Sequence, residues 1–174
     1  MKTFESLLLP AMAIKGDTWD TSIVSHEQHQ QNVADILPIM LAEVGLPYWR
    51  HGQDISQAGR RILFGIAPWS KYDLMFLDEM ADAIRAGRTT DALIEVFSID
   101  DACSTIAEFM QYYPVEPQYP FPCAGLWVDG VFESIYEGHT AKAFIRSELG
   151  MPACSQTSRV PRWLRFLRRT NQRK

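Results

Sequence analysis

Cysteine is scarce in this sequence, which has three cysteines in 174 residues and no Cys-x-x-Cys pair. Three thiols are too few, and odd in number, for a disulfide framework, so a reducing compartment such as the cytoplasm is expected. Metal-ligand spacing is missing as well. His26 and His29 lie three residues apart at a predicted helix start without a third ligand, whereas zinc sites need three or four. We therefore expect neither a metal nor a cofactor.

Long apolar runs are absent too. No stretch approaches the ~18–20 apolar residues that a membrane-spanning helix requires. The first thirteen residues contain Glu5 within a broken apolar run, which argues against a secretory signal peptide. Hydrophobic residues nevertheless make up 47% of the chain, enough for the core of one domain. These features predict a protein that is neither inserted in a membrane nor secreted.

Acidic residues are missing from the end of the chain. Residues 1–158 hold 10 lysines and arginines against 21 acids, a net charge of −11, whereas residues 159–174 hold seven basic residues and no acid. Apolar side chains flank these arginines, and we expect a partner to contact Arg162, Trp163, Arg165 and Arg168. Such a segment suits docking on a protein partner or on the acidic body, a membrane surface, or a polyanion, unless it stays disordered. Nucleic acid is an unfavoured partner, because the acidic body would repel it.

Hydrophobic periodicity predicts one α/β domain over residues 25–150, between a lead-in over 1–24 and a linker and basic tail over 151–174. Ser25 and Gln28 have the spacing of a capping box, and Leu37 and Leu41 lie on the apolar stripe of the helix that follows. A short strand at Leu7–Leu9 is expected in the lead-in. The elements predicted for the domain are helices over 26–44, 73–87, 100–113 and 140–149, strands over 61–67 and 92–97, and a hairpin over 122–137.

The hairpin carries the strongest local signal. Asp129-Gly130 stands between two apolar runs, and this dipeptide suits a two-residue turn in which both positions need positive φ. Pro122 cannot donate a hydrogen bond to a sheet, so it belongs at the first residue of its strand, where it stands. Gly138 closes the second strand before the last helix.

The 8- and 16-residue spacing of Gly130 and Gly138 from Pro122 resembles the C-terminal half of the thioredoxin fold, in which a cis-proline opens the strand. Upstream, Trp69 matches the tryptophan that precedes the redox cysteines of thioredoxins, but Ser70 and Asp73 stand where those cysteines would be. The resemblance implies a thioredoxin-like α/β fold, with a central mixed sheet flanked by helices and no disulfide chemistry, since exchange requires a thiolate. Thioredoxin-like hydrogenase-maturation chaperones similarly have phenylalanine-proline before this strand and no redox pair.

The resemblance to the redox-inactive branch of this superfamily implies a non-catalytic protein-binding module, such as a chaperone, adaptor or assembly factor. Its binding groove would be formed by Trp69, Ser70, Asp73, Phe121, Pro122 and Gly138. One alternative is a thiol-dependent oxidoreductase or glutathione-type enzyme that uses Cys123, which directly follows the proline and is expected near Ser70. A second alternative is a scaffold held at a membrane surface by the basic tail. The sequence leaves the oligomeric state open.

Overall fold

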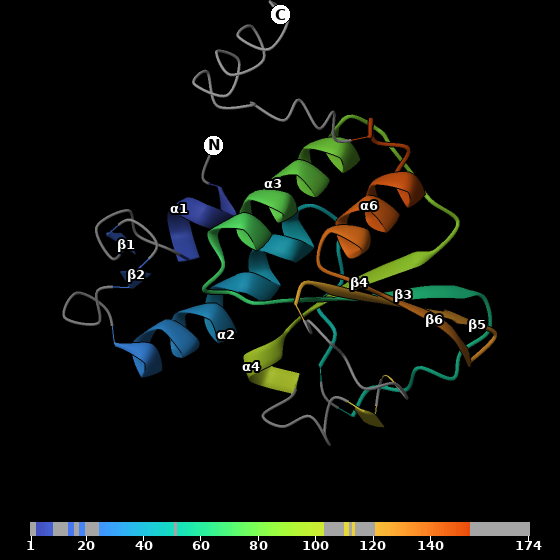
Figure 1. Ribbon diagram of the computed structural model, residues 1–174, viewed down its shortest axis with the longest axis horizontal. Coiled ribbons are helices and arrows are strands. Elements are labelled where there is room, and N and C mark those ends of the chain that lie inside the picture. Colours follow the sequence, from blue (N-terminus) through green and yellow to red (C-terminus); the bar gives the residue numbers. More distant parts are fainter. Residues whose placement is uncertain are drawn as a thin grey trace, which may run out of the picture.

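A mixed four-stranded sheet organises the structure, a computed structural model that describes residues 3–8, 14–15, 18–19, 25–50, 52–102, 110–111, 113 and 121–153. The strands of this sheet lie in the order β4-β3-β5-β6 (Figure 1). The described elements are α1 (Phe4–Leu8), β1 (Ile14–Lys15), β2 (Thr18–Trp19), α2 (His26–Glu43), β3 (Arg60–Ile66), α3 (Lys71–Arg85), β4 (Leu93–Ser98), α4 (Ile99–Ala102), β5 (Cys123–Val128), β6 (Val131–Glu137) and α6 (His139–Glu148).

The sheet contains one parallel strand pair and two antiparallel pairs. Helix α3 carries the chain from β3 to the parallel strand β4, as a parallel pair requires. Strand β5 then pairs antiparallel with β3, and β6 pairs antiparallel with β5. The β5–β6 turn is the predicted one, since Asp129 has φ 50° and Gly130 has φ 79°. A parallel bridge between Tyr48 and Val96 extends the sheet beyond β4.

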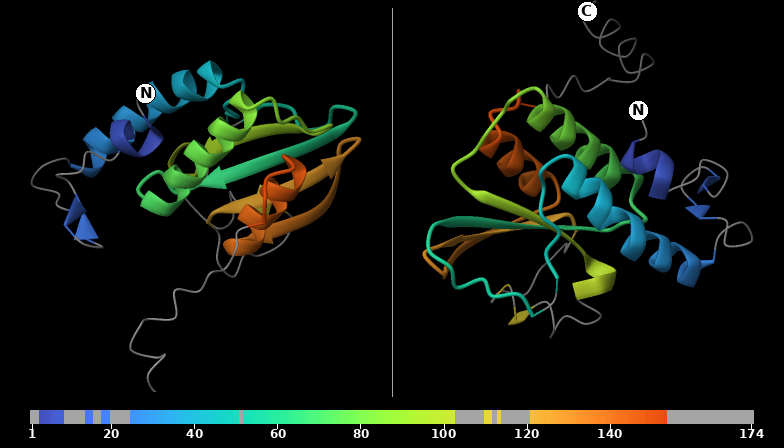
Figure 2. Two further views of the ribbon diagram at one scale, coloured as in Figure 1. Left: turned by 90° about the horizontal axis from the view of Figure 1, so that it is seen from above. Right: turned by 180° about the vertical axis from the view of Figure 1, so that it is seen from behind.

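The two faces of the sheet bury separate hydrophobic clusters. Four helices, α1, α2, α3 and α6, contribute residues to the larger cluster, which packs on Ile62, Phe64 and Val96. Helix α4 lies on the opposite face (Figures 1 and 2). That face holds a second, mainly aromatic cluster: Trp49, Leu63, Phe97, Tyr113, Cys123 and Trp127.

Most of the predicted elements that fall on described residues are confirmed. Helix α2 begins at the predicted cap, where the Ser25 side chain accepts a hydrogen bond from the Gln28 backbone N–H, and it buries Leu37 and Leu41. The β3, β4 and α6 segments also lie where periodicity placed them, within one or two residues. Residues 103–109 and the tail from 154 onward lie outside the described residues, so the predicted continuation of the 100–113 helix and the docking of the tail stay predictions.

The predicted strand at Leu7–Leu9 is wrong, because Phe4–Leu8 form helix α1. Phe4 and Leu8 are 2% and 1% exposed in the larger core, so this segment belongs to the domain and the boundary drawn at residue 25 cuts through the core. The backbone N–H of Phe4 donates to the Asp78 carboxylate on α3, at 2.8 Å. A free N–H at a helix start needs such an acceptor. Here it comes from 74 residues away, beyond the reach of local periodicity.

The helix-capping carboxylate gives the stability a pH dependence. Burial raises the pKa of Asp78 above its ordinary value and nearby Asp82 and Glu5 act in the same direction, against the hydrogen bonds from the Phe4 and Glu5 backbone. The folded protein therefore holds this proton more tightly than the unfolded chain does, and stability from this group increases as pH falls towards about 4. Urea unfolding of the wild type and Asp78→Asn at several pH values should show the wild type gaining on the variant as pH falls. A difference that does not change with pH would contradict this assignment.

Candidate functional site

Three chain segments meet at the end of the sheet where β3 leads into α3. Gly65 of β3 pairs with Cys123 of β5, and Cys123 pairs with Glu137 of β6. One residue further on, the Gly138 N–H donates to the Pro122 carbonyl at 2.8 Å. The Phe121–Pro122 peptide bond is cis, as the glycine spacing predicted. We call this region the Pro122 corner: it comprises Trp69, Ser70, Asp73, Phe121, Pro122 and Gly138.

Ser70 is the N-cap of α3. Its hydroxyl accepts a hydrogen bond from the Asp73 N–H at 3.3 Å, and its carbonyl accepts from the Leu74 N–H at 3.1 Å. Serine is favoured at this position because its side chain satisfies an N–H that has no partner within the helix. Ser70 thus fixes the first turn of α3 at the corner.

Asp73 is held inside the domain. Its side chain is 3% exposed, and one carboxylate oxygen lies 2.9 Å from the Lys142 Nζ of α6. The other oxygen accepts a hydrogen bond from the Ala67 N–H at 3.2 Å. Lys142 also donates to the Tyr72 carbonyl at 2.9 Å. The carboxylate therefore joins α3, α6 and the end of β3, and it supports the corner from beneath its surface.

Cys123 is fully buried among the aromatic residues of the second core. A Cβ placed on Gly65 would come within 2.8 Å of its sulfur, which shows how closely the thiol packs against β3. This core lies on the face opposite to the one that α3 covers. The structure thus places the thiol in the aromatic core, and its expected proximity to Ser70 stays a prediction. Cys103 and Cys154 lie outside the described residues.

The surface beside the corner is apolar. Trp69, Tyr72 and Met75 are 47%, 72% and 42% exposed, and they account for three of the seven large hydrophobic residues that are exposed in the described part of the chain. Their spacing of three residues places Tyr72 and Met75 as neighbours on α3, with Trp69 just before its cap. Three large side chains exposed together favour a contact surface. Sequence analysis identified Trp69 but missed Tyr72 and Met75. Their only signal in the sequence is that both lie outside the apolar stripe of α3.

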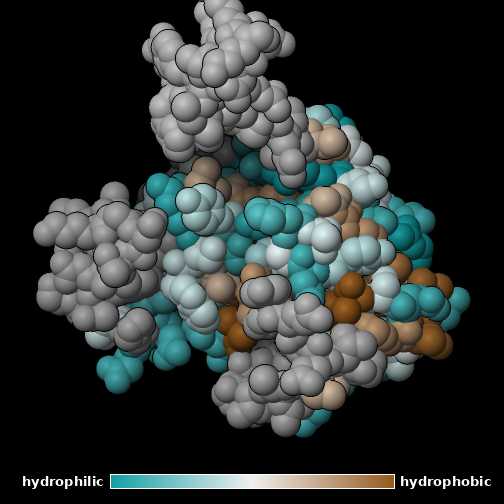
Figure 3. Space-filling view, in the orientation of Figure 1, coloured by the Kyte–Doolittle hydropathy of each residue, from teal (hydrophilic) through white to brown (hydrophobic). Residues whose placement is uncertain are grey.

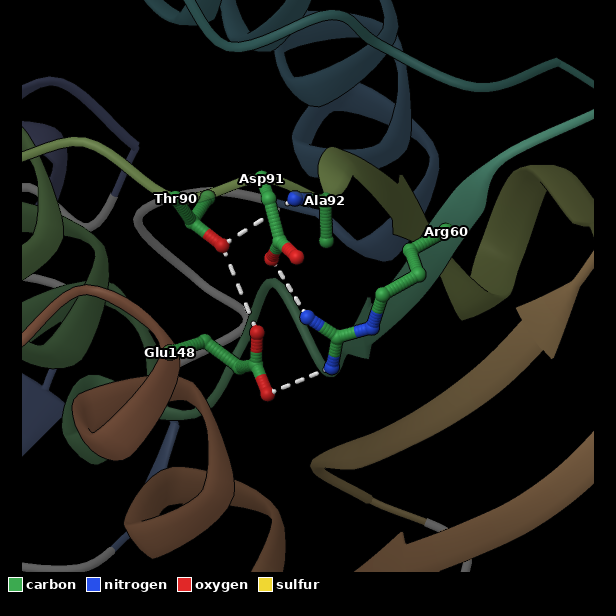
Figure 4. Close-up of polar contacts among 5 residues, drawn as sticks. All are labelled: Arg60, Thr90, Asp91, Ala92 and Glu148. Atoms are coloured by element: carbon green, nitrogen blue, oxygen red, sulfur yellow. Dashed lines mark hydrogen bonds and ion pairs between the residues drawn. The ribbon is translucent and has the colours of Figure 1, made fainter.

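The opposite end of the sheet carries a polar cluster with a structural role. Arg60 forms ion pairs with Asp91 and with Glu148, the latter at 2.9 Å, and the Thr90 hydroxyl donates to Glu148 at 3.3 Å (Figure 4). These contacts tie the start of β3 to the entry of β4 and to the end of α6. Because the charged groups of this cluster are paired with one another, few of them are left to bind a ligand.

The described residues contain no group of three or more His, Cys, Asp or Glu side chains that could hold a metal ion. None of the helices in this part of the chain is long and apolar enough to cross a membrane. A hollow of about 490 Å³ lies at the far ends of α3 and α6, where Glu79 is paired with Arg146. The predicted contacts Arg162, Trp163, Arg165 and Arg168 fall outside the described residues.

Comparison with known proteins gives similarity in structure only. No family model and no curated protein sequence matches this chain. Among solved structures, a mutant thioredoxin from Halobacterium salinarum is 18% identical over 60% of this chain and 91% of its own, with a TM-score of 0.39. Mitochondrial thioredoxin 3 from Saccharomyces cerevisiae is 16% identical over 56% of this chain and 83% of its own, with a TM-score of 0.37.

The fold assignment rests on the arrangement of the chain itself. A parallel β3–α3–β4 unit is followed by the antiparallel β5–β6 hairpin and by α6, in the sheet order β4-β3-β5-β6. A cis-proline immediately precedes the first strand of the hairpin, next to the start of α3. The chain therefore has a thioredoxin-like fold.

Proposed function

We propose that this protein is a non-catalytic protein-binding module that holds an extended apolar segment of a partner at the Pro122 corner. The observation that carries the proposal is a difference in exposure between neighbouring residues at the start of α3. Asp73, at a redox position of thioredoxins, is 3% exposed and paired with Lys142, whereas the neighbouring Trp69 is 47% exposed. The corner has a contact surface and no accessible thiol among its described residues.

The residue types support the proposed absence of redox chemistry. Disulfide exchange needs a thiolate that attacks a disulfide sulfur, and neither a serine hydroxyl nor a carboxylate does this. Ser70 and Asp73 are also engaged, one as the helix cap and the other in an ion pair. The thiol-enzyme alternative depends on Cys123, whose side chain is 0% exposed, while a reactive cysteine needs solvent access. These contacts support a binding role without thiol exchange.

The binding surface extends from Pro122 along α3. Trp69 and Tyr72 offer large apolar faces, and aromatic residues at the centre of an interface commonly supply much of its affinity. The ligand would lie alongside Pro122, where an extended segment can hydrogen-bond backbone groups in the manner of an added strand. Ser70 and Asp73 then act as positioning residues that hold the α3 start beneath the ligand.

The first expected result of this proposal is a lack of thiol–disulfide exchange activity. The full-length protein should not accelerate the reduction of insulin disulfides by dithiothreitol, and Cys123 in the native state should react with a thiol reagent only after denaturation. Both results follow from the burial of Cys123 and the lack of a redox pair. Insulin reduction above the uncatalysed rate that disappears in Cys123→Ser would favour the thiol enzyme instead.

Binding of a neutral apolar peptide is the second expected result. A suitable probe is the blocked hexapeptide Gly-Cit-Leu-Val-Leu-Gly, in which citrulline is a neutral isostere of arginine. Trp69→Ala should weaken its binding by at least about tenfold, as expected for an aromatic anchor. Leu93→Ala is the matched control, because Leu93 is 44% exposed on β4, away from the corner. Equal losses in the two variants, or no saturable binding to the wild type, would contradict the proposal.

A further inference from the structure

Glu137 differs from the other charged residues around the Pro122 corner because its side chain has no partner among the described residues. Asp73 is paired with Lys142 at 2.9 Å, and Lys71 with Glu5 at 3.2 Å. In contrast, Oε1 of Glu137 is buried and accepts no hydrogen bond from the described residues. A buried carboxylate oxygen without a donor is unfavourable, and the deficit is removed when a donor reaches it. A donor that reached this oxygen would satisfy it.

The position of Glu137 places this acceptor at the corner. It is the last residue of β6, its Cα partner is Cys123, and the next residue, Gly138, is hydrogen-bonded to Pro122. Residues directly opposite in an antiparallel pair share a face, so the Glu137 side chain lies on the face of the second core, where Phe121 packs. The carboxylate therefore lies one residue from the Gly138–Pro122 contact, on the side of the corner where Phe121 packs.

The strand that carries Glu137 is acidic and lies at one edge of the described sheet. Its charged residues are Glu133 and Glu137, with no basic residue from Val131 to Glu137, and no described residue forms an ion pair with either. Residues 1–158 as a whole have a net charge of −11. Figure 3 shows apolar residues among a largely hydrophilic surface, including a patch over the β5–β6 hairpin, where Val131 is 61% exposed. The β6 edge thus presents apolar side chains next to negatively charged ones.

We propose that the partner segment held at the Pro122 corner carries a lysine or arginine side chain beside its apolar residues, and that this cation donates to Glu137. The inference rests on the function proposed above and specifies its ligand. The apolar residues would cover Trp69 and Tyr72, while the cation supplies the donor that the Glu137 Oε1 lacks. An acidic segment would instead meet two unpaired carboxylates on β6, which disfavours it.

The test compares three blocked hexapeptides on the full-length protein by calorimetry: Gly-Arg-Leu-Val-Leu-Gly and its citrulline and glutamate counterparts. The arginine peptide should bind about tenfold more tightly than the citrulline peptide, as expected for a charge-assisted hydrogen bond to a buried acceptor. The glutamate peptide should bind most weakly. Glu137→Gln should abolish the preference for arginine, so that the arginine and citrulline peptides bind this variant within about twofold of each other.

Glu133→Gln is the matched control, because it removes the same charge from the same strand about 13 Å away from Glu137. It should leave the arginine preference within about twofold of the wild type. Equal binding of the arginine and citrulline peptides to the wild type overturns this inference but leaves the proposed function standing. Failure of all three peptides overturns both. Self-association of the wild type that is lost in Glu137→Gln, without peptide binding, assigns the edge to a second copy and also overturns the inference.

Discussion

Lys142→Met is expected to lower the free energy of unfolding by about 3–5 kcal/mol, the range seen when one partner of a buried ion pair is removed. The reason is that Asp73, whose side chain is 3% exposed, would lose the Lys142 ammonium that lies 2.9 Å away. Lys142 also donates to the Tyr72 carbonyl, so that bond is lost as well. Urea denaturation followed by circular dichroism measures the change.

Two variants separate this pair from a general effect of losing a lysine. Lys71→Met breaks the ion pair with Glu5, whose partners are 53% and 34% exposed, and should cost less than about 1 kcal/mol. The double variant Asp73→Asn/Lys142→Met removes both charges and keeps an acceptor for the Ala67 N–H, so it should recover much of the lost stability. A double variant as unstable as Lys142→Met alone would show that packing, not the stranded charge, dominates.

Leu37→Ala is expected to destabilise the domain by about 2–5 kcal/mol, the usual cost of deleting a buried leucine side chain. Leu37 is 0% exposed on α2, in the core that this helix shares with α1, α3 and α6. The cavity left behind would adjoin side chains from several elements, which cannot all close around it. Thermal and urea denaturation both report the change.

Ile39→Ala on the same helix is the control for Leu37→Ala. Ile39 is 62% exposed, so its truncation removes similar atoms from a mostly solvated site and should change stability by less than about 0.5 kcal/mol. A Leu37→Ala effect of that small size would contradict the packing of α2 on the core. A large Ile39→Ala effect would instead place the outer face of α2 in an interface between protein molecules.

The features predicted correctly from sequence are those whose causes are local. The Asp129-Gly130 turn needs only two residues with positive φ, and the Ser25 cap only a hydroxyl three residues before its donor. The spacing of Pro122, Gly130 and Gly138 likewise identified the hairpin and the α6 start. These signals predicted the hairpin and its flanking elements before any tertiary contact was known.

The features that sequence analysis missed depend on residues far apart in the chain. Helix α1 is capped by Asp78, 74 residues from Phe4, and Asp73 is neutralised by Lys142 on another helix. Periodicity carries no information on such partners. The aromatic residues that surround Cys123 come from several segments, which local patterns in the sequence do not bring together. Glu137 has no local signature, since its lack of a partner is visible only in the folded arrangement.

The most direct measurement of the proposed function is a titration of isotopically labelled full-length protein with the arginine hexapeptide, followed through backbone amide chemical shifts. The shifts should saturate reversibly and concentrate at Trp69–Tyr72, Phe121, Cys123 and Glu137–Thr140, with every cysteine still unmodified by mass spectrometry. Shifts confined to the hollow beside Met151, a covalent adduct, or no shifts at millimolar peptide would contradict a binding site at the Pro122 corner.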